Sequence, residues 1–157
     1  MAEQRVQRRL AAILAADVVG YSRMMGEDEE DTLRVLHGHR DIIDRLIEEH
    51  QGRIFGTAGD SVIAEFPSAV AAVRAGAAIQ GAVDRLNQGL PEARQMRFRI
   101  GINLGDVMVD GTDLHGDGVN VAARLEALAQ PGSICISGAV YEQVKGKDAL
   151  GYEALGE

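Results

Sequence analysis

The apolar run from Ala11 to Val19, interrupted only by Asp17, constrains the fold of this chain more than any other stretch. A continuous run of this length, without polar alternation, predicts a central strand of a sheet rather than a half-exposed one. Gly20 and the acidic cluster at residues 27–31 follow it. They indicate where the strand ends and a helix begins, because acidic residues favour the positive N-terminal end of a helix.

The remaining pattern predicts a defined order of elements. Apolar residues at helical spacing continue to Gly52, and Gly59-Asp60 forms the turn of a hairpin between two short strands. The further expected elements are a helix opened by Pro67-Ser68, a strand over 96–109 interrupted near Gly105-Asp106, a helix within 116–129, a strand over 133–137 and a helix over 139–144.

This order, β-α-β-β-α-β followed by α-β-α, predicts an α+β fold with a ferredoxin-like core and an appended αβα unit. No linker, repeat or low-complexity stretch interrupts the chain, so we expect one domain over residues 1–157.

Composition excludes several classes of partner. The chain is 46% hydrophobic and 25% charged, which is typical of a globular domain with a core. Its net charge of -8 argues against nucleic acid and anionic membranes, which repel an acidic chain. No run approaches the roughly 20 apolar residues that span a bilayer. A single cysteine, Cys135, fits a reducing compartment. We therefore expect a cytoplasmic domain without membrane insertion.

Two aspartates are candidates for a metal site. The expected topology places the end of the first strand beside the hairpin tip, so Asp17 and Asp60 can meet. Two such carboxylates, with nothing basic expected beside them, repel each other, and a divalent cation such as Mg²⁺ or Mn²⁺ removes that cost. Two metals would clamp an in-line phosphoryl displacement. The alternative is that Asp60 is a turn residue and Asp17 a strand-end cap.

The turn after Asp17 is a candidate phosphate-binding segment, because free backbone N–H groups before a helix can hold a triphosphate. The candidate residues are Val18, Val19, Gly20, Tyr21 and Ser22.

A second group of candidates lies further along the chain. Asn120 and Arg124 are four residues apart and share a helix face, where an amide and a guanidinium suit a ribose and a phosphate. A solvated face with a glycine-rich cap is the alternative. Arg97 and Arg99 alternate on a strand and could cover acidic neighbours or bind phosphate. Three histidines on the first long helix match no metal pattern, and we expect surface or partner-facing positions for His37, His39 and His50.

Four blocks of the chain, AILAADVVGYS, TAGDSVIAEF, RIGINLGDV and DLHGDGVNVAARLE, occur in one order over nearly its whole length. In order and spacing they resemble the signature blocks of the class III adenylyl/guanylyl cyclase catalytic domain, most closely the bacterial single-domain type. The resemblance implies attack of the ribose 3′-oxygen of ATP on the α-phosphate, with release of pyrophosphate.

The resemblance also implies roles for single residues. It makes Asp17 and Asp60 the ligands of two Mg²⁺ or Mn²⁺ ions, Arg99 a phosphate contact, Asn120 the ribose-orienting residue, Arg124 the residue that stabilises charge on the α-phosphate, and Asp113 the acceptor for the adenine amine. In such enzymes one protomer supplies the metal aspartates and the other supplies the asparagine and arginine. The site would therefore exist only in a dimer, with two sites in a homodimer.

Two departures from the family pattern bear on activity. The family motif is K-T-x-G-D, with a lysine that helps to select adenine, whereas this chain has Gly56 at that position. A charge-assisted hydrogen bond of this kind is worth about 1.5–3 kcal/mol. Family members also continue past the stretch that ends here at Glu157 with a hairpin that carries a lysine for the triphosphate.

The sequence thus favours an adenylate cyclase-like domain, with ATP and possibly GTP as substrate. The first alternative is a degenerate cyclase-like domain that binds nucleotide or a partner and regulates. The second is another phosphoryl-transfer enzyme on the same fold, such as a diguanylate cyclase or a polymerase-like palm, and the absence of a GG[DE]EF sequence at the hairpin opposes the diguanylate cyclase.

Overall fold

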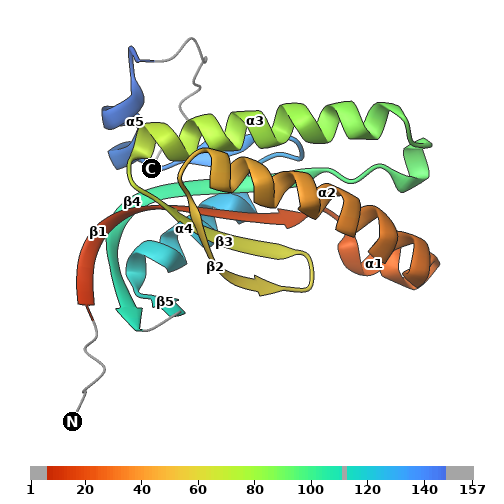
Figure 1. Ribbon diagram of the computed structural model, residues 1–157, viewed down its shortest axis with the longest axis horizontal. Helices are drawn as coiled ribbons and strands as arrows, with labels where there is room; N and C mark the ends of the chain where they lie inside the picture. The colour runs from red at the N-terminus through yellow and green to blue at the C-terminus, as the bar shows by residue number, and fades with distance from the viewer. Residues whose placement is uncertain (1–6, 111–112, 148–157) are drawn as a thin grey trace.

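The structure is a computed structural model that describes residues 7–110 and 113–147, without the side chains of residues 56–58 (Figure 1). Its strands are β1 (Gln7–Val18), β2 (Arg53–Ala58), β3 (Ser61–Phe66), β4 (Phe98–Asp110), β5 (Asp113–His115) and β6 (Ile134–Ile136). Its helices are α1 (Tyr21–Glu27), α2 (Glu29–Glu49), α3 (Ala69–Gln88), α4 (Asp117–Leu128) and α5 (Gly138–Val144), with a short 3-10 turn at Glu92–Arg94.

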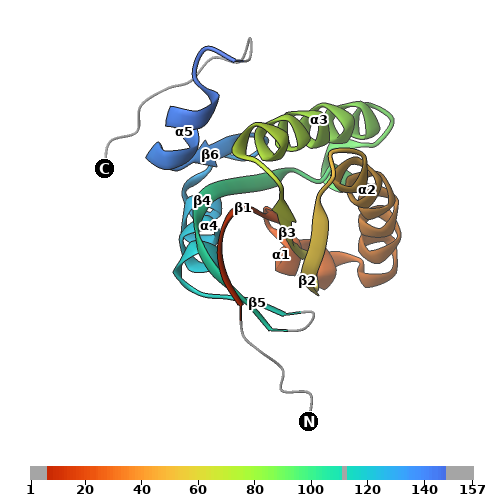
Figure 2. The same cartoon turned by 60° about the vertical axis from the view of Figure 1, so that its left-hand side comes forward.

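The strands form one sheet in the order β2-β3-β1-β4-β5, with antiparallel neighbours, and β6 pairs with β4 in parallel. Strand β1 therefore lies between β3 and β4, which confirms the expected ferredoxin-like core and the appended helix–strand–helix unit. The sheet curls so that its two ends, β2 and β5, come into contact (Figure 2).

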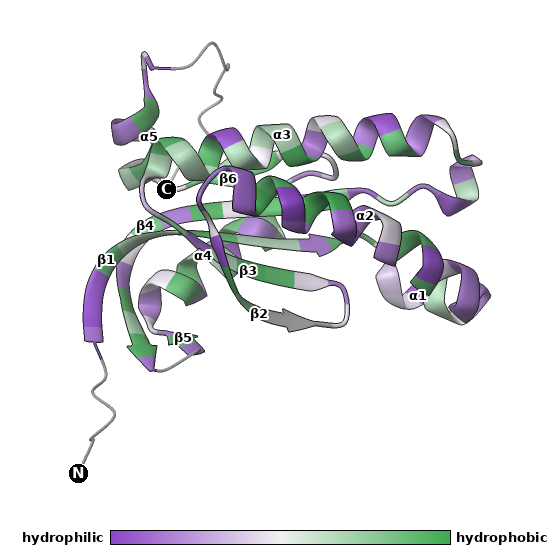
Figure 3. Cartoon of the chain, viewed as in Figure 1, coloured by the Kyte–Doolittle hydropathy of each residue, from purple (hydrophilic) through white to green (hydrophobic). Residues whose placement is uncertain are grey.

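From Ala11 to Val18, strand β1 is largely buried on both faces, as its apolar run predicts, whereas residues 7–10 are exposed. Within the buried stretch, even-numbered residues such as Leu14 pack into the larger core beneath α2 and α3. Odd-numbered residues such as Ile13 pack into a smaller cluster beneath α4. Figure 3 shows hydrophobic and hydrophilic residues alternating along α2 and α3, as on helices that cover a sheet with one face.

Strand β4 runs without a break, so the expected interruption near Gly105-Asp106 is wrong. Gly105 pairs with Ala11, and Asp106 pairs with Leu10, in the regular register. A Cβ on Gly105 would lie 2.9 Å from Nδ2 of Asn103 and 3.4 Å from the Cα atom of Gly118 in α4, and a Cβ on Gly118 would lie 2.6 Å from the Asp106 carbonyl oxygen. The glycine therefore allows the helix to approach the strand closely and does not end the strand.

His39 is a second correction, because it is buried with only 2% of its surface exposed. It lies on the inner row of α2 between Leu36 and Ile43, its Nδ1 is 2.9 Å from the carbonyl oxygen of Val35, and its ring packs against Phe98. Helical spacing from Leu36 to Ile43 already contained this signal. His37 is exposed and His50 is partly exposed.

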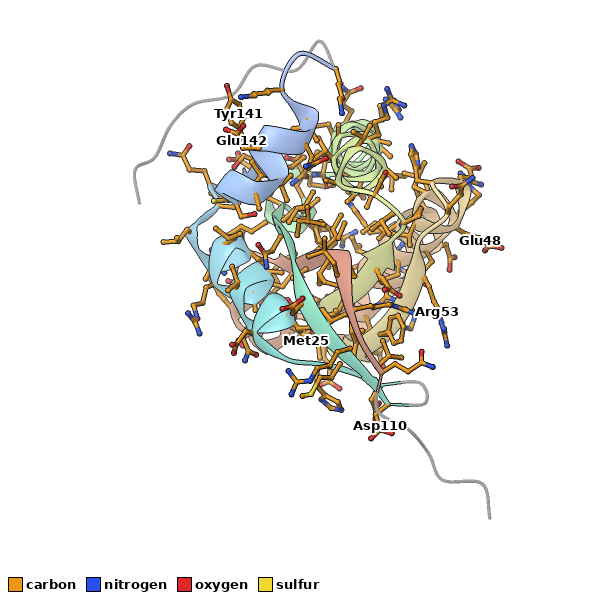
Figure 4. All side chains as sticks on the ribbon, turned by 90° about the vertical axis from the view of Figure 1, so that its left-hand side faces the viewer. Met25, Glu48, Arg53, Asp110, Tyr141 and Glu142 are labelled. Carbon is orange, nitrogen blue, oxygen red and sulfur yellow. The ribbon has the colours of Figure 1, made fainter. Side chains whose placement is uncertain are left out.

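None of the described helices combines the length and the hydropathy needed to cross a bilayer. In Figure 4, Tyr141 and Glu142 on α5 lie at the opposite end of the molecule from Asp110 at the end of β4. The stretch at residues 150–157, beyond which the expected C-terminal departure lies, is outside the described residues.

Candidate active site at the end of strand β1

The hairpin turn between β2 and β3 is attached to the end of β1. The Val18 amide donates a hydrogen bond of 2.8 Å to Oδ2 of Asp60, and Ala16 pairs with Val62 in the neighbouring ladder. Gly59 has a φ of 57°, which a glycine adopts without strain in this turn. The carboxylates of Asp17 and Asp60 therefore lie at the same end of adjacent strands, as the topology predicted.

Arg99 lies beside Asp17, so the expectation that nothing basic accompanies the two aspartates is wrong. The two residues are partners in the β1–β4 ladder, and Nε of Arg99 is 3.6 Å from Oδ1 of Asp17. Both of these atoms are buried, and neither has a hydrogen-bond partner among the described residues. This open ion pair leaves a donor for an anion and an oxygen for a cation next to each other.

A third carboxyl, that of Glu126 on α4, adjoins the pair and was not singled out from the sequence. Only 9% of Glu126 is exposed. The pKa of Glu126 is raised to about 7, chiefly by burial and then by the nearby Asp17 carboxyl, whereas Arg99 opposes the shift. The signal in the sequence is the row Gly118, Ala122 and Glu126, whose spacing of four places all three on one helix face.

The residues present fit a divalent metal. Asp17 Oδ1 is a buried hard oxygen without a partner, and the Val18 amide orients the Asp60 carboxylate toward the same strand end. Among the described residues, no three or more acidic, histidine or cysteine side chains are arranged to hold an ion. Asp17 and Asp60 are thus the candidate ligands, and Mg²⁺ ordinarily needs only one or two carboxylates beside water and phosphate oxygens.

The candidate phosphate-binding turn is smaller than expected. The Val18 amide is bonded to Asp60, and the Val19 amide donates to the Arg97 carbonyl oxygen at 2.9 Å. Neither amide is therefore free for a phosphate. The amides of Gly20, Tyr21 and Ser22 have no acceptor among the described residues and remain candidates.

Asn120 and Arg124 lie on the outer face of α4. Both are exposed, whereas Gly118, Ala122 and Glu126 face the sheet. Positions two residues apart on a helix are separated by about 200°. The Asn120–Arg124 face therefore points away from the Asp17 of its own chain.

Close backbone contact holds α4 in this orientation. A Cβ on Gly101 of β4 would lie 2.2 Å from the Glu126 nitrogen and 2.3 Å from the Ala122 oxygen, so the helix rests directly on the strand. The side-chain amide of Asn103 donates a hydrogen bond of 3.1 Å to the carbonyl oxygen of Gly118. A cavity of about 340 Å³, lined by Arg9, Arg53, Glu65 and neighbouring residues, lies elsewhere and includes neither candidate metal ligand.

Comparison with known protein families identifies the family of this chain. The family model of the adenylate and guanylate cyclase catalytic domain matches residues 4–157. The chain belongs to this family.

Relatives support the assignment. The chain is 50% identical over 153 residues to the putative adenylate cyclase 3 of Rhizobium meliloti, covering 97% of this chain and 26% of that protein. It is 30% identical to an adenylate cyclase of Streptomyces coelicolor, with 97% of this chain and 39% of that protein covered. The cyclase domain thus spans only about a quarter to two fifths of the length of these two relatives.

Solved structures agree in fold. An adenylate/guanylate cyclase/hydrolase from Silicibacter pomeroyi superposes with a TM-score of 0.90 at 41% identity, covering 97% of this chain and 89% of that one. The adenylyl cyclase CyaB from P. aeruginosa gives a TM-score of 0.81 at 26% identity, covering 91% and 84%.

The base-reading candidates of the cyclase domain lie on the two strands that the curled sheet brings into contact. Asp113 is exposed at the start of β5, opposite Asp110. Gly56 lies in β2 opposite Ile63, just after the register shifts between Ile54 and Gly56. Strands β2 and β5 are in contact in the curled sheet.

Proposed function

We propose that the domain converts ATP to 3′,5′-cyclic AMP and pyrophosphate at two composite sites of a homodimer. The observation that carries this proposal is the open Asp17–Arg99 pair at the strand end, with the Asp60 carboxylate fixed beside it. It supplies separate places for a cation and for a phosphate oxygen. GTP is the second candidate substrate.

Asp17 and Asp60 would hold two Mg²⁺ or Mn²⁺ ions. When bound, such ions lower the pKa of the ribose 3′-hydroxyl and neutralise charge on the phosphates. Arg99 would donate its free Nε–H to a phosphate oxygen, and the amides of Gly20 and Ser22 would hold the rest of the triphosphate.

Asn120 and Arg124 would complete the site from the other protomer. Asn120 orients the ribose, and Arg124 stabilises the negative charge that develops on the α-phosphate. The bond from the 3′-oxygen to phosphorus forms as the bond to the pyrophosphate oxygen breaks, and the hydroxyl proton passes to water. The opposite orientation of the Asn120–Arg124 face and of Glu126 on α4 supports a site shared between two chains.

Base preference should be weak. Asp113 would accept from the exocyclic amine of adenine and would face the carbonyl oxygen of guanine unfavourably, so ATP is preferred. Gly56 supplies no side-chain donor, so the preference is small and the KM is high. This glycine is also the observation that favours the alternative, a nucleotide-binding or regulatory dimerisation module without turnover.

A product assay tests the proposal. Purified protein is incubated with Mn²⁺ and either ATP or GTP, and cyclic nucleotide and pyrophosphate are measured by chromatography. We expect cyclic AMP, a lower rate with GTP, and no product from Asp60→Ala or Arg124→Ala. Nucleotide binding without any cyclic product would favour the regulatory module. We place this reaction in the cytoplasm, where ATP and Mg²⁺ are available.

A further inference from the structure

Glu126 has no part in the roles proposed above. Within residues 7–110 and 113–147, it is the only acidic residue that is buried. Burying a carboxyl group costs free energy of folding unless the group is hydrogen-bonded or paired with another charge. The position of Glu126 near the candidate metal ligands Asp17 and Asp60 therefore calls for a functional explanation.

Close backbone contact between α4 and β4 places Glu126 near Asp17. Gly101 lets α4 rest on β4, with the Glu126 nitrogen and Cα atoms directly over the strand. Gly101 lies two residues after Arg99, whose ladder partner is Asp17. From this point the Glu126 carboxyl is close enough to Asp17, Arg99 and Asp60 for each of them to act on its pKa.

Glu126 does not act as a third ligand. The three carboxylates of Asp17, Asp60 and Glu126 do not form a set that could hold an ion, among the residues that the structure describes. Glu126 lies on α4, whereas Asp17 lies near the end of β1. The effect of Glu126 on a cation would therefore pass through Asp17.

We propose that Glu126 is a positioning residue of the metal site, whose carboxyl restricts the orientation of Asp17. The inference rests on the proposed function, because it takes Asp17 and Asp60 as the ligands. Groups that orient a metal ligand typically change metal affinity or activity by about 10–100-fold when they are replaced.

Direct metal binding tests the proposal without turnover. Mn²⁺ is titrated into the protein with a non-cyclisable ATP analogue, and free Mn²⁺ is measured by electron paramagnetic resonance. Glu126→Gln keeps the shape of the side chain and removes its charge, and we expect a Kd for Mn²⁺ raised by about 10–100-fold. The matched control is Glu48→Gln on the exposed side of α2 (Figure 4), which should leave the Kd unchanged.

Glu126→Asp is a second variant that keeps the charge and shortens the side chain by one methylene. Its Kd should lie between those of the wild type and Glu126→Gln, and it decides the matter alone if Glu126→Gln does not fold. Wild-type affinity in every folded Glu126 variant overturns the inference. Mn²⁺ binding that does not depend on Asp60, shown with Asp60→Ala, would instead overturn the proposed metal site.

Mixed dimers separate a role beside Asp17 from a role in supporting Arg124 on the same helix. In a mixture of Asp17→Ala and Arg124→Ala chains, the intact site takes its Asp17 from the Arg124→Ala chain. Adding Glu126→Gln to that chain should lower cyclic AMP formation at limiting Mn²⁺. Adding Glu126→Gln to the Asp17→Ala chain should leave cyclic AMP formation unchanged.

The reverse pattern would overturn the inference, because it would assign Glu126 to the support of Arg124. If the parent mixture forms no product at all, the shared site fails. The Mn²⁺ titration then still decides the role of Glu126.

Discussion

Replacing Gly101 with alanine should displace α4 from the sheet. The added Cβ would lie 2.2 Å from the Glu126 nitrogen, 2.3 Å from the Ala122 oxygen and 2.8 Å from the Glu126 Cα. All three are helix backbone atoms, which cannot turn aside as a flexible side chain can. Ordinary van der Waals contact begins at 3.4 Å, so the helix must retreat by about 1 Å.

The cost follows from this displacement. Overpacking of this kind destabilises a protein by about 1–3 kcal/mol. At about 2–4 °C per kcal/mol for a chain of this size, the Tm should fall by several degrees. The same shift would move Arg124 by about 1 Å and withdraw Glu126 from Asp17, and misplacement on this scale can reduce catalysis about 100-fold. Thermal unfolding and the cyclic nucleotide assay measure the two effects.

Gly38 provides the control. An alanine Cβ there would meet nothing within 4 Å, and Gly38 lies inside α2. Gly38→Ala should therefore stabilise the protein by about 0.5–1 kcal/mol and leave activity unchanged. A Gly101→Ala protein with wild-type Tm and wild-type activity would refute the close-contact reasoning.

Three further predictions concern single side chains. Asn87→Ala should cost about 1–3 kcal/mol in urea unfolding, because Asn87 bonds both the amide and the carbonyl of Met96, and a loss below about 0.5 kcal/mol would contradict this. The pKa of Glu126 is about 7 in the folded protein, above its value in the unfolded chain. With a chelator present, the contribution of Glu126 to stability should therefore be full below about pH 4 and be lost as the pH rises through 7. The difference in unfolding free energy between wild type and Glu126→Gln should change by at most about 3 kcal/mol over that window, and a constant difference would be inconsistent with the raised pKa. Gly56→Lys should raise kcat/KM for ATP more than for GTP, and equal changes for both nucleotides would show that this position does not face the base.

The sequence predicted the fold well because the signals for its strands, helices and turns are local. The run from Ala11 to Val19 identified the central strand, and the turn at Gly59-Asp60 identified the hairpin that lies beside it. Strand order then followed from the known arrangement of such units. The break predicted in β4 failed because a glycine inside a strand signals either an interruption or a close approach, and only the position of α4 decides between them.

Side-chain neighbours across the sheet were harder to predict. Arg99 was recognised as a candidate, but its place opposite Asp17 depends on the register of two strands distant in sequence. Glu126 needed both that register and the contact at Gly101. The sequence does not reveal that the amides of Val18 and Val19 are bonded, because their acceptors, Asp60 and Arg97, lie on other segments.

The shared site is the central claim of this account, and one mixing experiment tests it most directly. Asp17→Ala and Arg124→Ala chains, each inactive alone, are combined in equal amounts and assayed for cyclic AMP with Mn²⁺. Half of randomly formed dimers are mixed and carry one intact site of two, so we expect roughly a quarter of the wild-type rate per chain. A mixture that stays as inactive as either parent, although mixed dimers are present, would contradict the account.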